Sequence, residues 1–127
     1  MRQFAHASGP LAGVPYSPAV RHGDLIFIAG QIGLGANGKL AEGGVAAETE
    51  ACLESMKRLL EEMGASMKDV VKTLVFLVDF KDLTAYNDVY RRYFREDFPA
   101  RSTVGTTELA LGARIEIEAV AVATRSR

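Results

Sequence analysis

Arg101 and Glu116 are the residues of this sequence whose types and positions best suit chemistry on a small molecule. Arg101 opens a predicted strand, where its planar guanidinium could hold both oxygens of a carboxylate, although a solvated surface arginine is equally typical there. Glu116 and Glu118 are two residues apart on the final predicted strand, so both carboxylates point to one face. Periodicity alone favours a solvated end of that face. Partial burial would instead raise the pKa of one glutamate and make it a base near neutral pH.

Three further side chains could contribute to a site, and each also has a simpler interpretation. Tyr16 lies in a segment broken by proline and glycine, where it could pack in a loop or donate a hydrogen bond to a ligand. Asn87 lies beside the apolar stripe of a predicted helix, a position more typical of local hydrogen bonding than of ligand contact. Cys52 lies on an apolar helix stripe, which favours a small core residue over a nucleophile.

A glycine-rich segment, residues 33–38, matches the pattern G-x-G-x-x-G of dinucleotide-binding proteins. That motif binds phosphate only where it leads directly from a strand into a helix. Here Asn37-Gly38 is a strong signal for a type I′ turn, and no helix is expected before Gly43-Gly44. The sequence therefore argues against nucleotide binding.

Composition indicates one ordinary globular domain over residues 1–127, with 48% hydrophobic and 24% charged residues. A net charge of −1 provides no positive field for nucleic acid or anionic lipid, so a small-molecule partner is expected. One cysteine and two histidines make a metal site of thiolates and imidazoles improbable. No stretch approaches a signal peptide or a membrane span, which predicts a cytoplasmic protein that has no membrane partner.

Hydrophobic periodicity predicts an α+β fold. The expected elements are a hairpin over 19–31, a helix over 45–63, a strand over 70–79 covered on both faces, a helix over 83–94, and strands over 101–107 and 114–123. We expect the last two strands to lie side by side, which would bring Arg101 near Glu116. Two helices can cover one face of such a sheet, yet the last strand is apolar on both sides. The second face is therefore expected to pack against another subunit.

Several segments together make the chain resemble the Rid (RidA/YjgF) family along nearly its whole length. The similar segments are residues 15–20, 29–32, 70–77, 86–90, 98–104 and 115–119, of which the last two are the most specific. The resemblance implies a chorismate-mutase-like fold, with a single sheet of about six strands and two helices packed on one face. It also implies a homotrimer with active-site clefts between subunits.

The same resemblance implies an enzyme that hydrolyses reactive 2-imino acids to 2-oxo acids and ammonia, without metal or organic cofactor. Arg101 would hold the substrate carboxylate with the backbone amide of Thr103, and Glu116 would activate the water. Tyr16, Gly30 and Asn87 would line the pocket, with Tyr16 assisting catalysis. The chain departs from the common family pattern at several positions, which concern the subgroup and its substrate: Ala29, Thr103, Gly105 and Ala110.

Two other functions are compatible with the sequence. The first is a non-catalytic trimeric protein that binds small 2-oxo or amino acids for regulation, although binding alone would not require Glu116. The second is RNA cleavage or inhibition of translation, which the resemblance also suggests for some family members. The net charge of −1 argues against the second.

Overall fold

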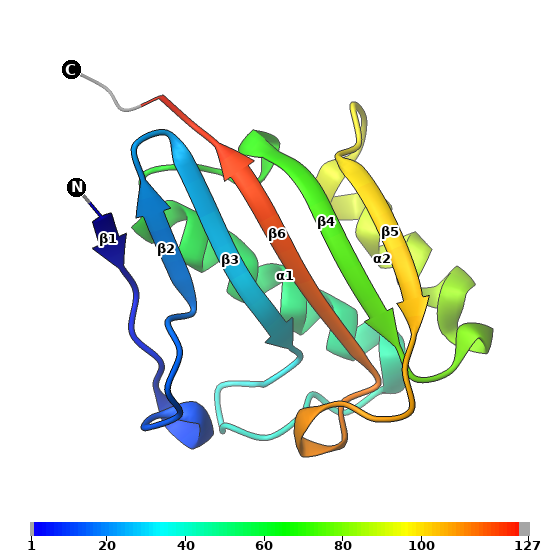
Figure 1. Cartoon of the computed structure of the whole chain (residues 1–127). Helices are drawn as coiled ribbons and strands as arrows, with labels where there is room; N and C mark the ends of the chain where they lie inside the picture. Colours follow the sequence, from blue (N-terminus) through cyan, green and yellow to red (C-terminus); the bar gives the residue numbers. More distant parts are fainter. Residues whose placement is uncertain (1, 125–127) are drawn as a thin grey trace.

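The computed structural model describes residues 2–124 and contains one six-stranded sheet and two α-helices (Figure 1). The strands are β1 (Arg2–Phe4), β2 (Ala19–His22), β3 (Leu25–Ile32), β4 (Val70–Leu77), β5 (Ala100–Gly105) and β6 (Ile115–Val122). The helices are α1 (Gly44–Glu62) and α2 (Leu83–Phe94), and four short 3₁₀ turns complete the structure: η1 (Gly9–Leu11), η2 (Met67–Asp69), η3 (Phe80–Asp82) and η4 (Ala110–Gly112). The expected α+β class and both expected helices are confirmed.

The strands are arranged in the order β1-β2-β3-β6-β4-β5. β6 runs antiparallel between β3 and β4, whereas β5 pairs in parallel with β4 alone. The connection from β4 to β5 passes through α2, as parallel neighbours require. The expectation that the last two strands lie side by side is therefore wrong, because β4 separates them.

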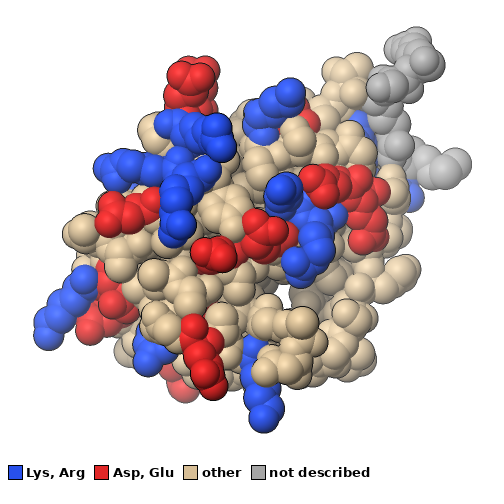
Figure 2. All heavy atoms as spheres, turned by 180° about the vertical axis from the view of Figure 1, so that it is seen from behind, with Lys and Arg blue, Asp and Glu red and all other residues tan. Residues whose placement is uncertain are grey.

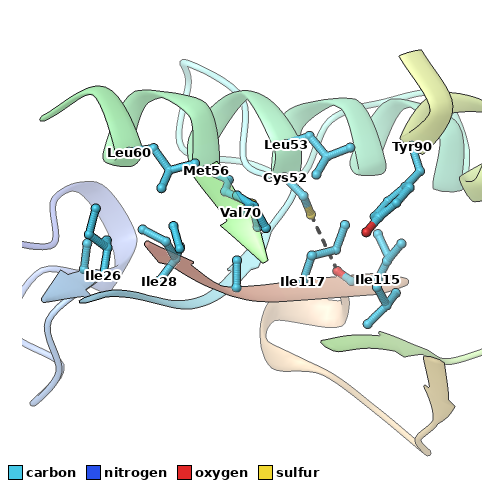
Figure 3. Close-up of a cluster of buried hydrophobic side chains, with 14 of the residues drawn as sticks. Ile26, Ile28, Cys52, Leu53, Met56, Leu60, Val70, Tyr90, Ile115 and Ile117 are labelled. Carbon is cyan, nitrogen blue, oxygen red and sulfur yellow. Dashed lines mark hydrogen bonds between the residues drawn. The ribbon is translucent and has the colours of Figure 1, made fainter. Parts of the chain in front are cut away.

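Both helices pack on one face of the sheet and form the core with it (Figures 1 and 3). The apolar stripe of α1 is buried as the periodicity predicted, at Cys52, Leu53, Met56 and Leu60. Ile115 and Ile117 face this stripe from β6, and both are fully buried. The helix ends just before Gly64, whose φ of 83° is a left-handed conformation that favours glycine. Neither helix within residues 2–124 is long and apolar enough to cross a membrane.

The opposite face of the sheet is open in the single chain (Figure 1). Leu25, Phe27, Val104 and Val122 lie on this open face, and each is 41–47% exposed. Within one chain only Val70, Thr73, Val75 and Leu77 of β4 are buried, so the strand is covered on one face. Cover of its other face by another subunit stays a prediction. An apolar face of this kind is typical of an interface with another protein.

The glycine-rich loop reverses direction where the sequence predicted, but by another turn type. The amide of Gly38 donates to the carbonyl of Gly35 (3.0 Å), and a bridge joins Leu34 to Leu40. Gly38 has a positive φ of 77°, whereas Asn37 is not among the described residues with positive φ. A type I′ turn needs both, so that assignment is wrong. The loop does not lead directly into α1, which agrees with the argument against nucleotide binding.

Candidate active site

Arg101 lies on edge strand β5 and reaches toward helix α2. It is in register with Thr73 of β4, which is buried beneath the helices. The Arg101 guanidinium carbon lies 4.9 Å from the ring centroids of both Tyr86 and Tyr90, and its Nη1 donates to Oδ1 of Asn87 at 2.8 Å. Within residues 2–124, no carboxylate forms an ion pair with Arg101. Its charge is therefore available to an anionic ligand.

Thr103 lies on the same side of β5, two residues further along. Its hydroxyl is hydrogen-bonded to the Tyr86 hydroxyl at 2.8 Å. Arg101 and Asn87 also line a cleft of about 300 Å³ between α2 and the start of β5, together with Tyr90, Arg91, Phe98 and Pro99. Arg101, Asn87 and Thr103, which the sequence singled out separately, therefore form one group. We call these three residues the arginine half-site.

Glu116 is the centre of a second group, which also contains Gly30 and Tyr16. Gly30 lies against the Glu116 side chain, and a Cβ at Gly30 would overlap the carboxylate, so any larger residue would require the Glu116 side chain to move. Partial burial, and then the negative charge of Glu118, raise the pKa of Glu116 above its usual range. Burial and the Glu116 charge also raise the pKa of the Tyr16 hydroxyl. We call Tyr16, Gly30 and Glu116 the glutamate half-site.

The two half-sites lie on opposite faces of the sheet. Residues of β6 with odd numbers are buried under the helices, so Glu116 and Glu118 project to the open face, as their spacing predicted. Arg101 instead lies on the helix side, against Tyr86 and Tyr90. β4 also separates their strands. One chain thus brings the six candidate residues together as two groups of three.

Cys52 belongs to the core, as its position on the helix stripe predicted. It is fully buried, and its sulfur lies 3.1 Å from the Gln31 carbonyl oxygen. The sulfur also lies 4.0 Å from the Ile115 carbonyl oxygen, the contact drawn in Figure 3. Burial, followed by the charges of Glu48 and Glu116, raises the pKa of the thiol. Such a thiol is a poor nucleophile.

Tyr86 and Tyr90 of α2 are two residues that the sequence analysis did not assign to the site. They are buried, yet they also provide the aromatic surface beneath Arg101. Their four-residue spacing on either side of Asn87 was the available signal, because residues so spaced share one helix face.

No group of three or more metal-binding side chains is found among residues 2–124.

The family model described as endoribonuclease L-PSP matches residues 6–123. A human protein named 2-iminobutanoate/2-iminopropanoate deaminase is 43% identical over 122 residues, which cover 95% of this chain and 89% of the human one.

Solved structures of other proteins share this fold. RidA from an Antarctic Psychrobacter bacterium superposes with a TM-score of 0.88 at 34% identity, over 95% of this chain and 99% of that one. The YjgF gene product of E. coli superposes with a TM-score of 0.86 at 36% identity, over 94% of this chain and 96% of that one. A matched family model over nearly the whole chain and relatives of this similarity lead to one conclusion: the chain belongs to the endoribonuclease L-PSP family, which includes RidA and YjgF.

Proposed function

We propose that this protein is an enzyme that hydrolyses 2-imino acids to 2-oxo acids and ammonia. The observation that carries the proposal is the presence, on one small fold, of an arginine that has no carboxylate partner within residues 2–124 and of a glutamate with a raised pKa. The arginine suits the carboxylate that all 2-imino acids carry, and the glutamate suits activation of water. Several curated relatives, the human protein among them, are named for this reaction.

The reaction needs a positioned water and one group that moves protons. Water adds to the C=N carbon of the protonated imine while the Glu116 carboxylate accepts a proton from the water, which gives a neutral carbinolamine. Return of that proton to nitrogen makes ammonia the leaving group, and as the C–N bond breaks the Glu116 carboxylate takes the hydroxyl proton and the 2-oxo acid forms. The raised pKa of Glu116 lies closer to neutral pH than that of an ordinary glutamate, which helps the carboxylate both to accept the proton and to return it. Arg101 and the Thr103 amide would hold the carboxylate throughout, so that the imine carbon stays beside the water.

A homotrimer would complete the site by placing the arginine half-site of one subunit against the glutamate half-site of the next. Opposite faces of one sheet cannot contact the same small molecule, so a neighbouring chain has to supply one half. Glu116 lies on the open apolar face of the sheet. Burial of the apolar residues of this face between subunits would stabilise such an assembly. Three chains around an axis give three equivalent clefts.

A non-catalytic role in binding 2-oxo or amino acids would use the same Arg101 but would not require Glu116 as a proton acceptor. The family description makes RNA cleavage a further candidate. Over much of the helix-covered side, however, Lys and Arg alternate with Asp and Glu (Figure 2), and the net charge is −1. A cytoplasmic location, expected from the sequence, is part of our proposal.

The direct experiment generates imines in situ from several amino acids with an amino-acid oxidase and follows free imine by trapping. We expect the protein to shorten the lifetime of the imine and to release one ammonia per 2-oxo acid. The matched inactive control is Arg101→Ala. Absence of acceleration with every imine, together with measurable binding of a 2-oxo acid, would favour the non-catalytic role. Cleavage of a single-stranded RNA that persists in Glu116→Gln would favour a separate nuclease activity.

A further inference from the structure

The Arg101 guanidinium lies in a notch between two tyrosine rings of α2. Tyr86 and Tyr90 are one helical turn apart, and their rings meet nearly at right angles, at 86° with centroids 5.9 Å apart. The guanidinium carbon is 4.9 Å from each centroid. Both contacts are within the range of a cation–π interaction. Asn87, between the two tyrosines in sequence, accepts a hydrogen bond from Nη1.

The rings themselves are fixed at both ends. Each is attached to α2 through its Cα, and each hydroxyl is hydrogen-bonded at 2.8 Å to a threonine of the sheet, Tyr90 to Thr73 and Tyr86 to Thr103. Phe94 packs against Tyr90, with ring centroids 4.6 Å apart. The notch is therefore built from buried side chains that are hydrogen-bonded to the sheet.

We propose that Tyr86 and Tyr90 are positioning residues that hold Arg101 ready to bind the substrate carboxylate. This inference rests on the proposed function. An arginine on an edge strand ordinarily loses much side-chain freedom when it binds a ligand, and that loss weakens binding. Here two rings and Asn87 restrain the guanidinium before the ligand arrives. A single hydrogen bond to Asn87 leaves the other N–H donors for two carboxylate oxygens.

The test replaces the rings and measures binding of 2-oxobutanoate by calorimetry together with imine turnover. Tyr90→Leu removes one wall of the notch and should raise the Kd roughly 3- to 30-fold, the range of a cation–π contact. KM should rise by a similar factor while kcat changes little, because the carboxylate contact is made equally before and during the reaction. Tyr90→Phe keeps the ring and should keep the Kd within about twofold, although it loses the Thr73 hydrogen bond.

Two controls separate positioning from general damage to α2. Phe94→Leu removes an aromatic ring from the same stack without touching Arg101, and should leave the Kd within about twofold. The neutral probe 2-oxobutanamide lacks the carboxylate, so its weaker binding should not respond to Tyr90→Leu. Tyr86→Leu removes the other wall of the notch. It replaces Tyr90→Leu in the binding test if Tyr90→Leu does not fold, and the same increase in Kd is expected.

Equal effects of Tyr90→Leu and Phe94→Leu on the Kd would overturn the inference, because they would show a purely structural role. Loss of binding in Tyr90→Phe equal to that in Tyr90→Leu would overturn it too, since the hydroxyl and not the ring would then matter. An unchanged Kd in Arg101→Ala would instead reject the carboxylate site of the proposed function, and the inference with it.

Discussion

Arg101 and Glu116 lie on opposite faces of one sheet, on two strands that β4 keeps apart. Arg101 is in register with Thr73 of β4, and Glu116 is in register with Phe76. Neighbouring strands are about 4.8 Å apart and each residue advances about 3.3 Å along a strand. The two side chains therefore start far apart and diverge. Any mechanism that uses both on one small substrate requires two chains.

Mixing two inactive variants should restore activity if each cleft combines two subunits. Arg101→Ala chains keep Glu116, and Glu116→Gln chains keep Arg101. Random mixing after co-refolding would give an intact cleft in about one quarter of cases, since each half must come from the right chain. Imine turnover near that fraction of the unmutated rate is expected, with a trimer mass by light scattering. No recovery in mixed trimers, or a monomer at micromolar concentration, would contradict the composite site.

The sequence predicted the elements well but missed the order of two strands. Periodicity located α2 and the strands on either side of it because each buries one regular stripe. It could not show that β6 inserts between β3 and β4, because strand order depends on pairings between distant segments. The segment from residue 70 to 105 is a strand, a helix and a strand, which implies a parallel pair. That pattern was the available signal that β5 pairs with β4.

The candidate residues were found by resemblance more than by pattern. Gly30 shows why, since its importance is a close approach to Glu116 that no local spacing reveals. The shared face of Glu116 and Glu118, in contrast, followed directly from strand alternation. Which neighbour each glutamate meets depends on the adjacent strand, and only the structure shows Gly30 beside Glu116.

Replacing Tyr16 by phenylalanine should weaken catalysis only modestly. The change removes one neutral hydroxyl, worth roughly 0.5–1.5 kcal/mol as a hydrogen bond, which corresponds to about a 2- to 13-fold loss of kcat/KM. The raised pKa of this phenol keeps it protonated as a donor near neutral pH. Steady-state kinetics on the trapped-imine assay provide the measurement. A loss of several thousandfold would show that the phenol is itself a principal proton-transfer group.

Arg21 should matter for stability and not for catalysis. Its buried guanidinium donates to the carbonyls of Gly23 (2.9 Å), Met63 (2.6 Å) and Ala123, and so joins the β2–β3 turn, the end of α1 and the residue after β6. Arg21→Met leaves these carbonyls without that donor and should lower the free energy of unfolding by roughly 2–4 kcal/mol.

The matched control for Arg21 is Arg58→Met on the exposed side of α1, which should change stability by less than about 0.5 kcal/mol. Urea unfolding of both variants beside the parent protein gives the comparison. An Arg21→Met protein as stable as the parent would mean that the cost of burying the charge cancels its three hydrogen bonds.

Glu116→Gln and Glu118→Gln should differ sharply although both side chains project from the same face of β6. Glutamine at 116 keeps the shape beside Gly30 but removes the base, so kcat should fall roughly 10²- to 10⁴-fold while a 2-oxo acid still binds. Glutamine at 118 should leave turnover largely unchanged. Kinetics and calorimetry on the two variants test this directly. The reverse pattern would show that Glu118, and not Glu116, activates the water.

The pH profile of kcat/KM should show the raised pKa of Glu116. Its carboxylate is the proton acceptor, so kcat/KM should fall as pH decreases through a pKa above the usual 4.5.

The stability of the fold should respond to pH in the opposite sense. A carboxyl whose pKa is higher in the folded than in the unfolded state favours folding below both pKa values, and that contribution is lost as pH rises through the folded pKa. Glu116→Gln should therefore be more stable than the parent at neutral pH, with the difference shrinking in acid. Urea unfolding of both proteins across this pH range measures the difference. A variant less stable than the parent at neutral pH would contradict this prediction, because it would show that the fold stabilises ionised Glu116.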